Sequence, residues 1–236
     1  YFHETFSSFD AATDIIDGLN IAFLDLALRI RRTKYGKQFL ISPTESPESF
    51  QINLNHASSG TQFVVPLLAI LRYYAHEFSF KEAFQRSVLN YLYEQEQLSR
   101  FRPEIEQGDL SKYIHVHLEE PELSLDPNAQ RELISTMVRQ VFYDHAADRE
   151  LHLLLATHSP YIVNQINVLL RASYSKNNVP YPALNPEWVD VYVVEDGTIS
   201  SLMATDNTSG QAVVNTLRFA QLMEAIYKEY QEIKTE

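Results

Sequence analysis

The chain contains no cysteine, so disulfides and thiolate metal sites are excluded. This absence is compatible with a reducing cytoplasm, where we expect the protein to act. No apolar run reaches the roughly 18 residues that a membrane-spanning helix needs, and no basic-then-apolar leader opens the sequence. We therefore expect no membrane partner and no export.

Cations and glycines are also scarce. The 19 Lys and Arg residues face 31 Asp and Glu residues, giving a net charge of −12, which argues against a broad phosphate-binding surface and leaves direct nucleic-acid binding uncertain. The six glycines are too far apart to form a G-x-x-x-x-G-K-[ST] or a G-x-G-x-x-G loop. The sequence as it stands therefore has no glycine-rich loop to cradle phosphates.

One cluster runs against the acidic balance: Arg29, Arg31, Arg32, Lys34 and Lys37. Residues 10–33 have apolar residues at three- and four-residue steps, a spacing that predicts a helix. The cluster then marks the solvated end of that helix, where cations suit the helix dipole. A local site for nucleic acid is the alternative.

Residues 48–78 read as a half-buried strand, "ESFQINL", a break at "ASSGTQ", and a buried helix, "FVVPLLAILRYYAHEF". Residues 79–111 are helical in period but polar and charged, which predicts a helical insertion. It serves either as a partner-contact element or as a solvated helical hairpin.

After Gly108, strands and helices alternate. "YIHVHL" predicts a strand, and a helix follows with Asp126 as N-cap and Pro127 at its first position. "LHLLLATHS" predicts a strand buried on both faces, followed by a helix capped by Ser159. A C-terminal helix lies within 205–236. This order predicts an α/β fold, a single domain over residues 1–236, with a largely parallel sheet and flanking helices.

The ends of the two strands carry the reactive side chains. Glu119 and Glu120 end the first, and His158 ends the second, at the edge where α/β sheets bind ligands. One interpretation is Mg²⁺ held with substrate phosphates, with the second glutamate activating a water. Another is a metal-dependent hydrolase, with zinc or iron on His115, His117, Glu119 and His158. A third is surface carboxylates without a role.

On the covered face of a parallel sheet, His115 and His117 would point into a helix layer. We therefore expect them to hydrogen-bond within the packing or to lie near the exposed start of the strand. This expectation disfavours the zinc or iron site.

Four motifs resemble those of the soluble ABC-type ATPases grouped with the OLD, RecF and SMC/Rad50 proteins. "IHVHLEEPE" is similar to their Walker B strand, "LSLDP" to the D-loop, "LLLATHSPYIV" to the strand that ends in the switch histidine, and "ASSGTQ" to the signature motif. The resemblance covers roughly residues 50–205. It implies the C-terminal lobe of a P-loop NTPase that uses ATP and Mg²⁺, in a DNA-repair, OLD-like or phage-defence context.

The resemblance also implies roles for residues. Glu119 would hold Mg²⁺ through water, Glu120 would polarise the attacking water, and His158 would contact the γ-phosphate. Phosphate of the nucleotide on the opposite protomer would be bound by Ser58, Ser59 and Gly60, and Asp126 would couple the two sites. Glu122 receives no chemistry; it is expected to be a rim carboxylate or a support for the D-loop.

The departures from the family pattern concern the Walker A loop and the Q-loop, which are both missing from these 236 residues. The resemblance therefore implies a missing N-terminal lobe, either truncated, cleaved or encoded separately, and a chain that is inactive alone. It further implies a homodimer in the ATP-bound state and leaves an effector protein possible. A non-catalytic interaction scaffold is a further alternative.

OLD-type proteins carry a Toprim nuclease after the ATPase, with an acidic residue on one strand and a D-x-D pair on another. "VYVVEDGTIS" offers Glu195 and Asp196, but no D-x-D pair follows. A hairpin that turns at Asp196-Gly197 is the better interpretation.

Overall fold

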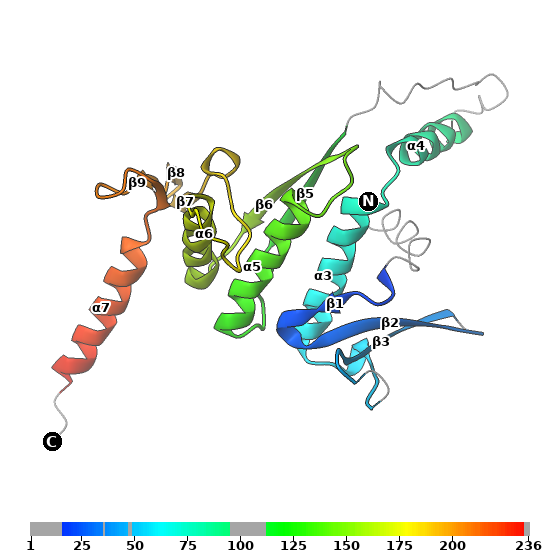
Figure 1. Cartoon of the computed structure of the whole chain (residues 1–236), viewed down its shortest axis with the longest axis horizontal. Coiled ribbons are helices and arrows are strands. Elements are labelled where there is room, and N and C mark those ends of the chain that lie inside the picture. Colours follow the sequence, from blue (N-terminus) through cyan, green and yellow to red (C-terminus); the bar gives the residue numbers. More distant parts are fainter. Residues whose placement is uncertain (1–15, 35, 47–48, 95–111, 234–236) are drawn as a thin grey trace. The chain divides into compact units, whose positions relative to one another are not determined.

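The computed structural model describes residues 16–34, 36–46, 49–94 and 112–233 (Figure 1). These residues group into two compact units. The first comprises the chain before Glu119 together with Gln140–Leu155, and the second comprises Glu119–Arg139 with the chain from Ala156 onward. Residues 95–111 of the predicted insertion lie outside the described residues.

The first unit opens with an antiparallel sheet whose strand order is β1-β2-β3-β4. Its two long strands, β2 and β3, form a hairpin paired from Leu26↔Pro43 to Thr33↔Gly36. Gly36 has φ +125°, a conformation that only glycine adopts readily, and the Thr33 hydroxyl donates to its carbonyl at 2.8 Å. The bounds are β1 Asn20–Ile21, β2 Leu26–Thr33, β3 Gly36–Pro43 and β4 Ile52–Asn53.

The helix predicted over residues 10–33 is wrong in its described part, because residues 20–33 form β1, a short 3₁₀ turn at Ala22–Leu24 and β2. The deciding partner is β3, which pairs Phe39, Leu40 and Ile41 with β2 along its whole length. Such a pairing with a distant segment overrides local periodicity. The expectation of a largely parallel sheet is likewise wrong for this part of the chain.

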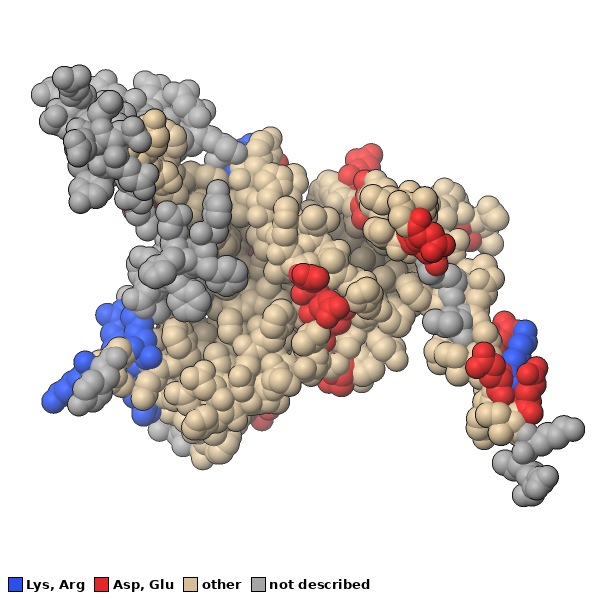
Figure 2. Space-filling view, turned by 180° about the vertical axis from the view of Figure 1, so that it is seen from behind, with Lys and Arg blue, Asp and Glu red and all other residues tan. Residues whose placement is uncertain are grey.

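The basic cluster therefore lies on a hairpin and not at a helix end. Arg29, Arg31, Arg32 and Lys34 are exposed, and Figure 2 shows a group of blue side chains on the projection at its lower left. Arg31 donates to the Gln51 side chain at 3.0 Å.

The buried helix predicted after "ASSGTQ" is confirmed. A 3₁₀ turn, η2 (Leu54–His56), leads into α3 (Ser59–His76), and α4 (Phe80–Glu94) follows. Val64, Leu68 and Leu71 of α3 are at most 1 % exposed. This apolar burial makes α3 the central helix of the first unit.

Strands β5 (Tyr113–Glu119) and β6 (Glu150–Ala156) pair with each other. At their starts the Glu150 N–H donates to the Lys112 carbonyl, and at their ends the Glu120 N–H donates to the Ala156 carbonyl, both at 2.8 Å. Starts meet starts and ends meet ends, so the pair is parallel, as predicted. An ion pair between Lys112 and Glu150 also joins the starts. Their hydrogen bond raises the pKa of Lys112 and lowers that of Glu150.

One face of this pair packs into the core, where Ile114 and Leu151 form a buried cluster with Ala75 and Val141. The other face is exposed: Leu154, for example, is 61 % exposed. The prediction that β6 is buried on both faces is therefore wrong among the described residues. Two positions were expected for His115 and His117, within the packing or near the exposed start of the strand; both residues are exposed, so the first is wrong.

In the second unit, α6 (Pro160–Ser173) packs on α5 (Pro127–Phe142), which continues into the first unit. The contact includes a polar chain: Arg131 Nε donates to Gln165 Oε1 at 2.9 Å, and Gln165 Nε2 donates to Ser135 Oγ at 3.1 Å. Gln165 is only 1 % exposed, so these bonds satisfy a polar group that would be costly to bury alone.

The remaining elements are small sheets and a helix. The predicted hairpin at Asp196-Gly197 is confirmed as β7 (Tyr192–Glu195) and β8 (Thr198–Ser201), and β9 (Met203–Thr205) pairs with β10 (Ala212–Val214). A 3₁₀ turn, η5 (Pro186–Trp188), precedes them, and α7 (Leu217–Glu232) follows. Within the described residues, no helix has the length and apolarity required to cross a membrane.

Candidate functional site

The chain leaves β5 through an unusual backbone conformation at Glu120, whose φ is +45°. The Leu123 N–H donates to the Glu120 carbonyl at 3.1 Å, and the Leu125 N–H donates to the Glu122 carbonyl at 3.1 Å. Two consecutive turns thus carry the chain from β5 toward α5, with Ser124 also at positive φ, +62°. A left-handed conformation at a residue other than glycine costs about 1–3 kcal/mol and concentrates at functional sites.

Glu120 faces the loop that follows β6. Its Oε1 lies 3.5 Å from His158 Nε2. The two side chains are 39 % and 90 % exposed, so the pair sits at the surface, where a ligand can reach it. Glu119, the last residue of β5, is also exposed. Parallel pairing of β5 and β6 brings these three residues to one edge, as the sequence predicts.

Glu122 differs from its two neighbours because it is buried, at 8 % exposure. Its Oε1 accepts a hydrogen bond from the Thr157 hydroxyl and another, of 3.3 Å, from the His158 N–H. Sequence reasoning expected a rim carboxylate or a support, and the burial rules out the rim. No local signal in the sequence marked Glu122 as the buried carboxylate, because its partners Thr157 and His158 are 35 and 36 residues away.

The loop after β6 is tied down by Ser159, which is the predicted N-cap of α6. Ser159 Oγ accepts from the N–H groups of Tyr161 and Ile162 at 3.1 and 3.3 Å and donates to Gln130 Oε1 of α5. The Ser159 N–H in turn donates to Thr157 Oγ1 at 3.0 Å. His158 therefore sits between two residues whose side chains are fixed by hydrogen bonds.

Asp126 caps α5, as predicted. Its Oδ1 accepts from the N–H groups of Asn128 and Ala129 at 2.9 and 3.2 Å. Such a cap satisfies N–H groups that the helix leaves unpaired. The side chain is exposed.

The signature-like residues belong to the first unit and begin α3. Ser58 is the N-cap, with its Oγ accepting from the Thr61 N–H at 3.3 Å and lying 2.8 Å from the Thr61 hydroxyl. Ser59 is exposed and Gly60 is buried. Gln62 donates to the carbonyls of Asn55 and Ala57 at 3.2 and 2.8 Å, which fixes the entry to the helix.

The alternative metal-binding set does not come together among the described residues, where no group of three or more His, Asp or Glu side chains is placed to hold a metal ion. The ring of His115 instead lies against that of His152 of β6 in a tilted arrangement, with ring centroids 5.0 Å apart and an interplanar angle of 35°.

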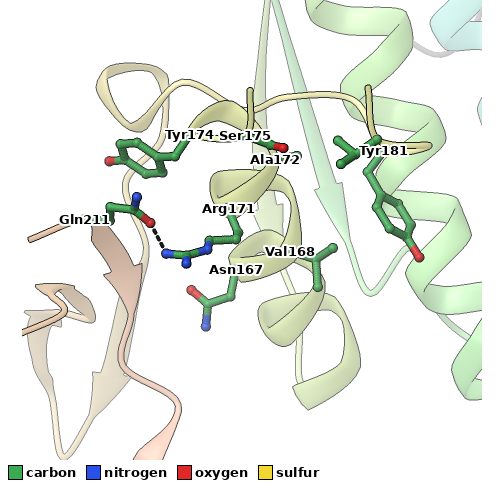
Figure 3. Close-up of a pocket in the computed structure, with 9 residues that line it drawn as sticks. Asn167, Val168, Arg171, Ala172, Tyr174, Ser175, Tyr181 and Gln211 are labelled. Carbon is green, nitrogen blue, oxygen red and sulfur yellow. Dashed lines mark hydrogen bonds between the residues drawn. The ribbon is translucent and has the colours of Figure 1, made fainter. Parts of the chain in front are cut away.

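A cavity of about 520 Å³ also lies in the second unit, beside the C-terminal half of α6 (Figure 3). Its polar lining is occupied by structural bonds: Arg171 donates to Gln211, Tyr174 Oη accepts from the Ala212 N–H at 3.1 Å, and Asn167 exchanges two bonds with the Val214 backbone. These contacts fasten β10 to α6. None of the acidic strand-end residues lines this cavity.

Comparison with known proteins gives one family match. The family model described as "AAA domain, putative AbiEii toxin, Type IV TA system" matches residues 44–164, just over half of the chain. That segment contains the signature-like residues, both strand ends and His158. No curated protein matches the sequence.

Among solved structures, one described as "Structural biochemistry of ATP-driven dimerization and DNA stimulated activation of SMC ATPases" is similar. The match covers 99 % of this chain and 98 % of that one at 10 % identity, with a TM-score of 0.38. The family match therefore rests on the sequence model alone, and by it this chain belongs to the family of AAA domains described as "putative AbiEii toxin, Type IV TA system".

Proposed function

We propose that the acidic strand ends form the hydrolytic half of an ATPase site. The observation that carries this proposal is the pairing of Glu120 with His158 across β5 and β6, at 3.5 Å and open to solvent, within the segment that matches the family. A carboxylate and an imidazole side by side can hold a water and a phosphate oxygen together.

Each side chain receives one role. Glu120 accepts a proton from, and orients, the water that attacks the γ-phosphate. His158 donates a hydrogen bond to a γ-phosphate oxygen. Glu119, which is exposed at the end of β5, is proposed to hold a hydrated cation.

The oxygen donors present fit Mg²⁺, which proteins bind through one or two carboxylates plus substrate phosphates. When bound, the ion would neutralise phosphate charge. The carboxylate of Glu119 is exposed, so it can contact such an ion through water without losing a bond that the fold needs.

Ser58, Ser59 and Gly60 are proposed to bind a nucleotide held by a second protomer. In support, they form the N-terminus of an 18-residue helix, where N–H groups and the helix dipole favour anions. Asp126 is proposed to sense the second site. Its cap bonds use Oδ1, and the exposed carboxylate remains accessible to a partner.

The phosphates also need a glycine-rich loop, which we propose comes from a segment outside these 236 residues, on the same or another polypeptide. In support, β5 and β6 pair only with each other among the described residues, and their outer face exposes Tyr113 and Leu154. A further lobe would cover this surface. An ATP-bound homodimer and an effector protein complete the proposed assembly.

The biological context that we propose is phage defence, in line with the toxin-antitoxin system named in the family description. ATP hydrolysis to ADP and phosphate would then switch an effector.

The test is ATP turnover by the chain combined with the lobe that supplies the glycine-rich loop. Glu120→Gln should lower turnover by about 10²–10⁴-fold, because general-base assistance is lost. Asp196→Asn is the matched control, since Asp196 is an acidic residue with a similar φ, +49°, outside the site; its turnover should be unchanged. Wild-type turnover by Glu120→Gln would refute the role of Glu120. Turnover by the 236-residue chain alone would refute the external loop.

Elemental analysis separates the competing hydrolase. Protein purified without added metal should contain no stoichiometric zinc or iron, and finding either would favour a site built on His115, His117 and Glu119.

A further inference from the structure

Glu122 is the one acidic residue of the strand-end loops that faces the protein and not the solvent. It is 8 % exposed, whereas the side chain of Glu120, two residues earlier, is 39 % exposed. Burying a carboxylate is costly unless hydrogen bonds compensate. A glutamate at this position therefore needs a reason that an apolar residue would not satisfy.

The bonds of Glu122 supply that reason. Oε1 accepts from two donors, the Thr157 hydroxyl and the His158 N–H at 3.3 Å. Both donors belong to the loop after β6, while Glu122 belongs to the loop after β5. A single oxygen atom thus joins the two loops, and bonds to a charged acceptor are stronger than neutral ones.

The hydrogen bonds of Glu122 affect the position of His158. Its imidazole is 90 % exposed and lies 3.5 Å from Glu120, so packing contributes little to its position. Its backbone is held on one side by Glu122 and on the other by Ser159, the cap of α6. Removing Glu122 would take away the side-chain acceptor of the His158 N–H.

We propose that Glu122 is a positioning residue that sets the His158 backbone, so that the imidazole meets Glu120 and the γ-phosphate. The proposal rests on the ATPase function proposed above. Glu122 touches neither nucleotide nor metal; it acts through His158.

The environment of the second carboxylate oxygen of Glu122 is consistent with a role in positioning His158. Oε2 is buried and has no hydrogen-bond partner among the described residues. An unpaired buried acceptor is unfavourable, so the fold tolerates a cost here in order to keep Oε1 in place. Glutamine preserves the Oε1 acceptor and the side-chain volume, whereas alanine removes both.

The first arm of the test uses the 236-residue chain and the imidazole signals of His158 in NMR spectra, assigned with His158→Gln. Glu122→Ala should shift and broaden the His158 signal, and Glu122→Gln should leave it close to wild type. Ser135→Ala is the control, because it removes a buried hydroxyl that bonds Gln165 and the Arg131 carbonyl in the same unit; it should leave the signal unchanged. An unchanged His158 signal in Glu122→Ala would overturn the proposal.

The second arm uses the complete, ATP-hydrolysing assembly. Glu122→Ala should lower kcat by about 10- to 100-fold, the usual effect of losing a residue that orients a functional group, with KM for ATP within about threefold of wild type. Glu122→Gln should restore most of kcat. A loss of activity that only follows the loss of stability, as in Ser135→Ala, would overturn the positioning role.

If Glu122→Ala does not fold, Thr157→Val tests the same link, since it removes one of the two donors and keeps the side-chain shape. It should lower kcat in the same direction, and a wild-type kcat would count against the proposal. If His158→Ala and Glu120→Gln retain full turnover while Glu122→Ala still disturbs the His158 signal, the ATPase assignment fails and the structural link stands.

Discussion

The acidic end of β5, which faces His158 after β6, and the basic β2–β3 hairpin both concentrate charge of one sign, and they hold it in different ways. At the strand ends, Glu122 is buried and bonded to two donors, and Glu120 is held at positive φ opposite His158. On the hairpin, Arg29 and Arg31 of β2 and Lys34 of the turn are exposed. The strand-end loops thus hold Glu120 and Glu122 in defined conformations, whereas the hairpin exposes the long side chains of Arg29 and Lys34 to solvent.

The difference shows that charge density alone does not identify a functional site. Exposed charged side chains cost little folding free energy, and salt screens their mutual repulsion. A cluster of such charges on the surface therefore requires no particular side-chain geometry. A strained backbone and a buried carboxylate each cost stability. A strained backbone at Glu120 and a buried carboxylate at Glu122 occur within three residues. The loop after β5 therefore loses stability and gains a defined arrangement of these side chains.

The largest expected effect is on ATP turnover when Glu120 is replaced, and the same substitution should change stability in the opposite direction. Glu120→Gly should abolish the turnover of the complete assembly, by at least about 10²-fold. The same change should raise the free energy of unfolding by up to about 1 kcal/mol, because glycine adopts a left-handed conformation without strain. Turnover and urea unfolding of the same preparation check both effects.

Ser124→Gly is the control for the backbone term, since Ser124 also has positive φ, +62°, and carries no proposed chemistry. The Ser124→Gly variant should show a similar increase in the free energy of unfolding and should retain ATP turnover in the complete assembly. If Glu120→Gly is destabilised while Ser124→Gly is stabilised, then the conformation at Glu120 is not strained.

An intermediate effect is expected at the helix caps. Ser159→Ala should lower the free energy of unfolding by about 1–2 kcal/mol, because Ser159 is buried, caps two N–H groups and donates to Gln130. Ser58→Ala should cost at most about 1 kcal/mol, since the exposed Ser58 accepts from one N–H at 3.3 Å. Chemical denaturation measures both, and the reverse order would contradict the tighter fixing of the strand-end loops.

The smallest effect is expected on the hairpin. Arg29→Gln combined with Lys34→Gln should change the free energy of unfolding by no more than about 0.5 kcal/mol, as is usual for surface substitutions. A loss above about 1 kcal/mol in the same unfolding assay would mean that the hairpin charges are as constrained as the acidic ones, and the comparison would fail.

The sequence predicted the second unit better than the first. Asp126 and Ser159 were predicted as caps because each precedes a proline that opens a helix, a local signal. The approach of His158 to Glu120 followed from parallel pairing of two recognisable strands. By contrast, β2 was predicted as part of a helix, because its apolar residues fit a helical period and its partner strand β3 lies outside that window.

The role of Glu122 could not be predicted for a similar reason. Its partners, Thr157 and His158, are 35 and 36 residues away, and nothing in "EEPE" says which carboxylate turns inward. The sequence left open whether His115 and His117 are packed or exposed, because a strand pattern does not show whether a helix layer covers each face.

The most direct test of the ATPase site is a single-turnover experiment with labelled ATP on the complete assembly. Wild-type protein should convert bound ATP to ADP and phosphate, whereas Glu120→Gln should bind ATP and Mg²⁺ and retain the nucleotide uncleaved in an associated, dimeric form. Cleavage by Glu120→Gln at the wild-type rate would contradict the account, because the carboxylate opposite His158 would then have no part in activating water.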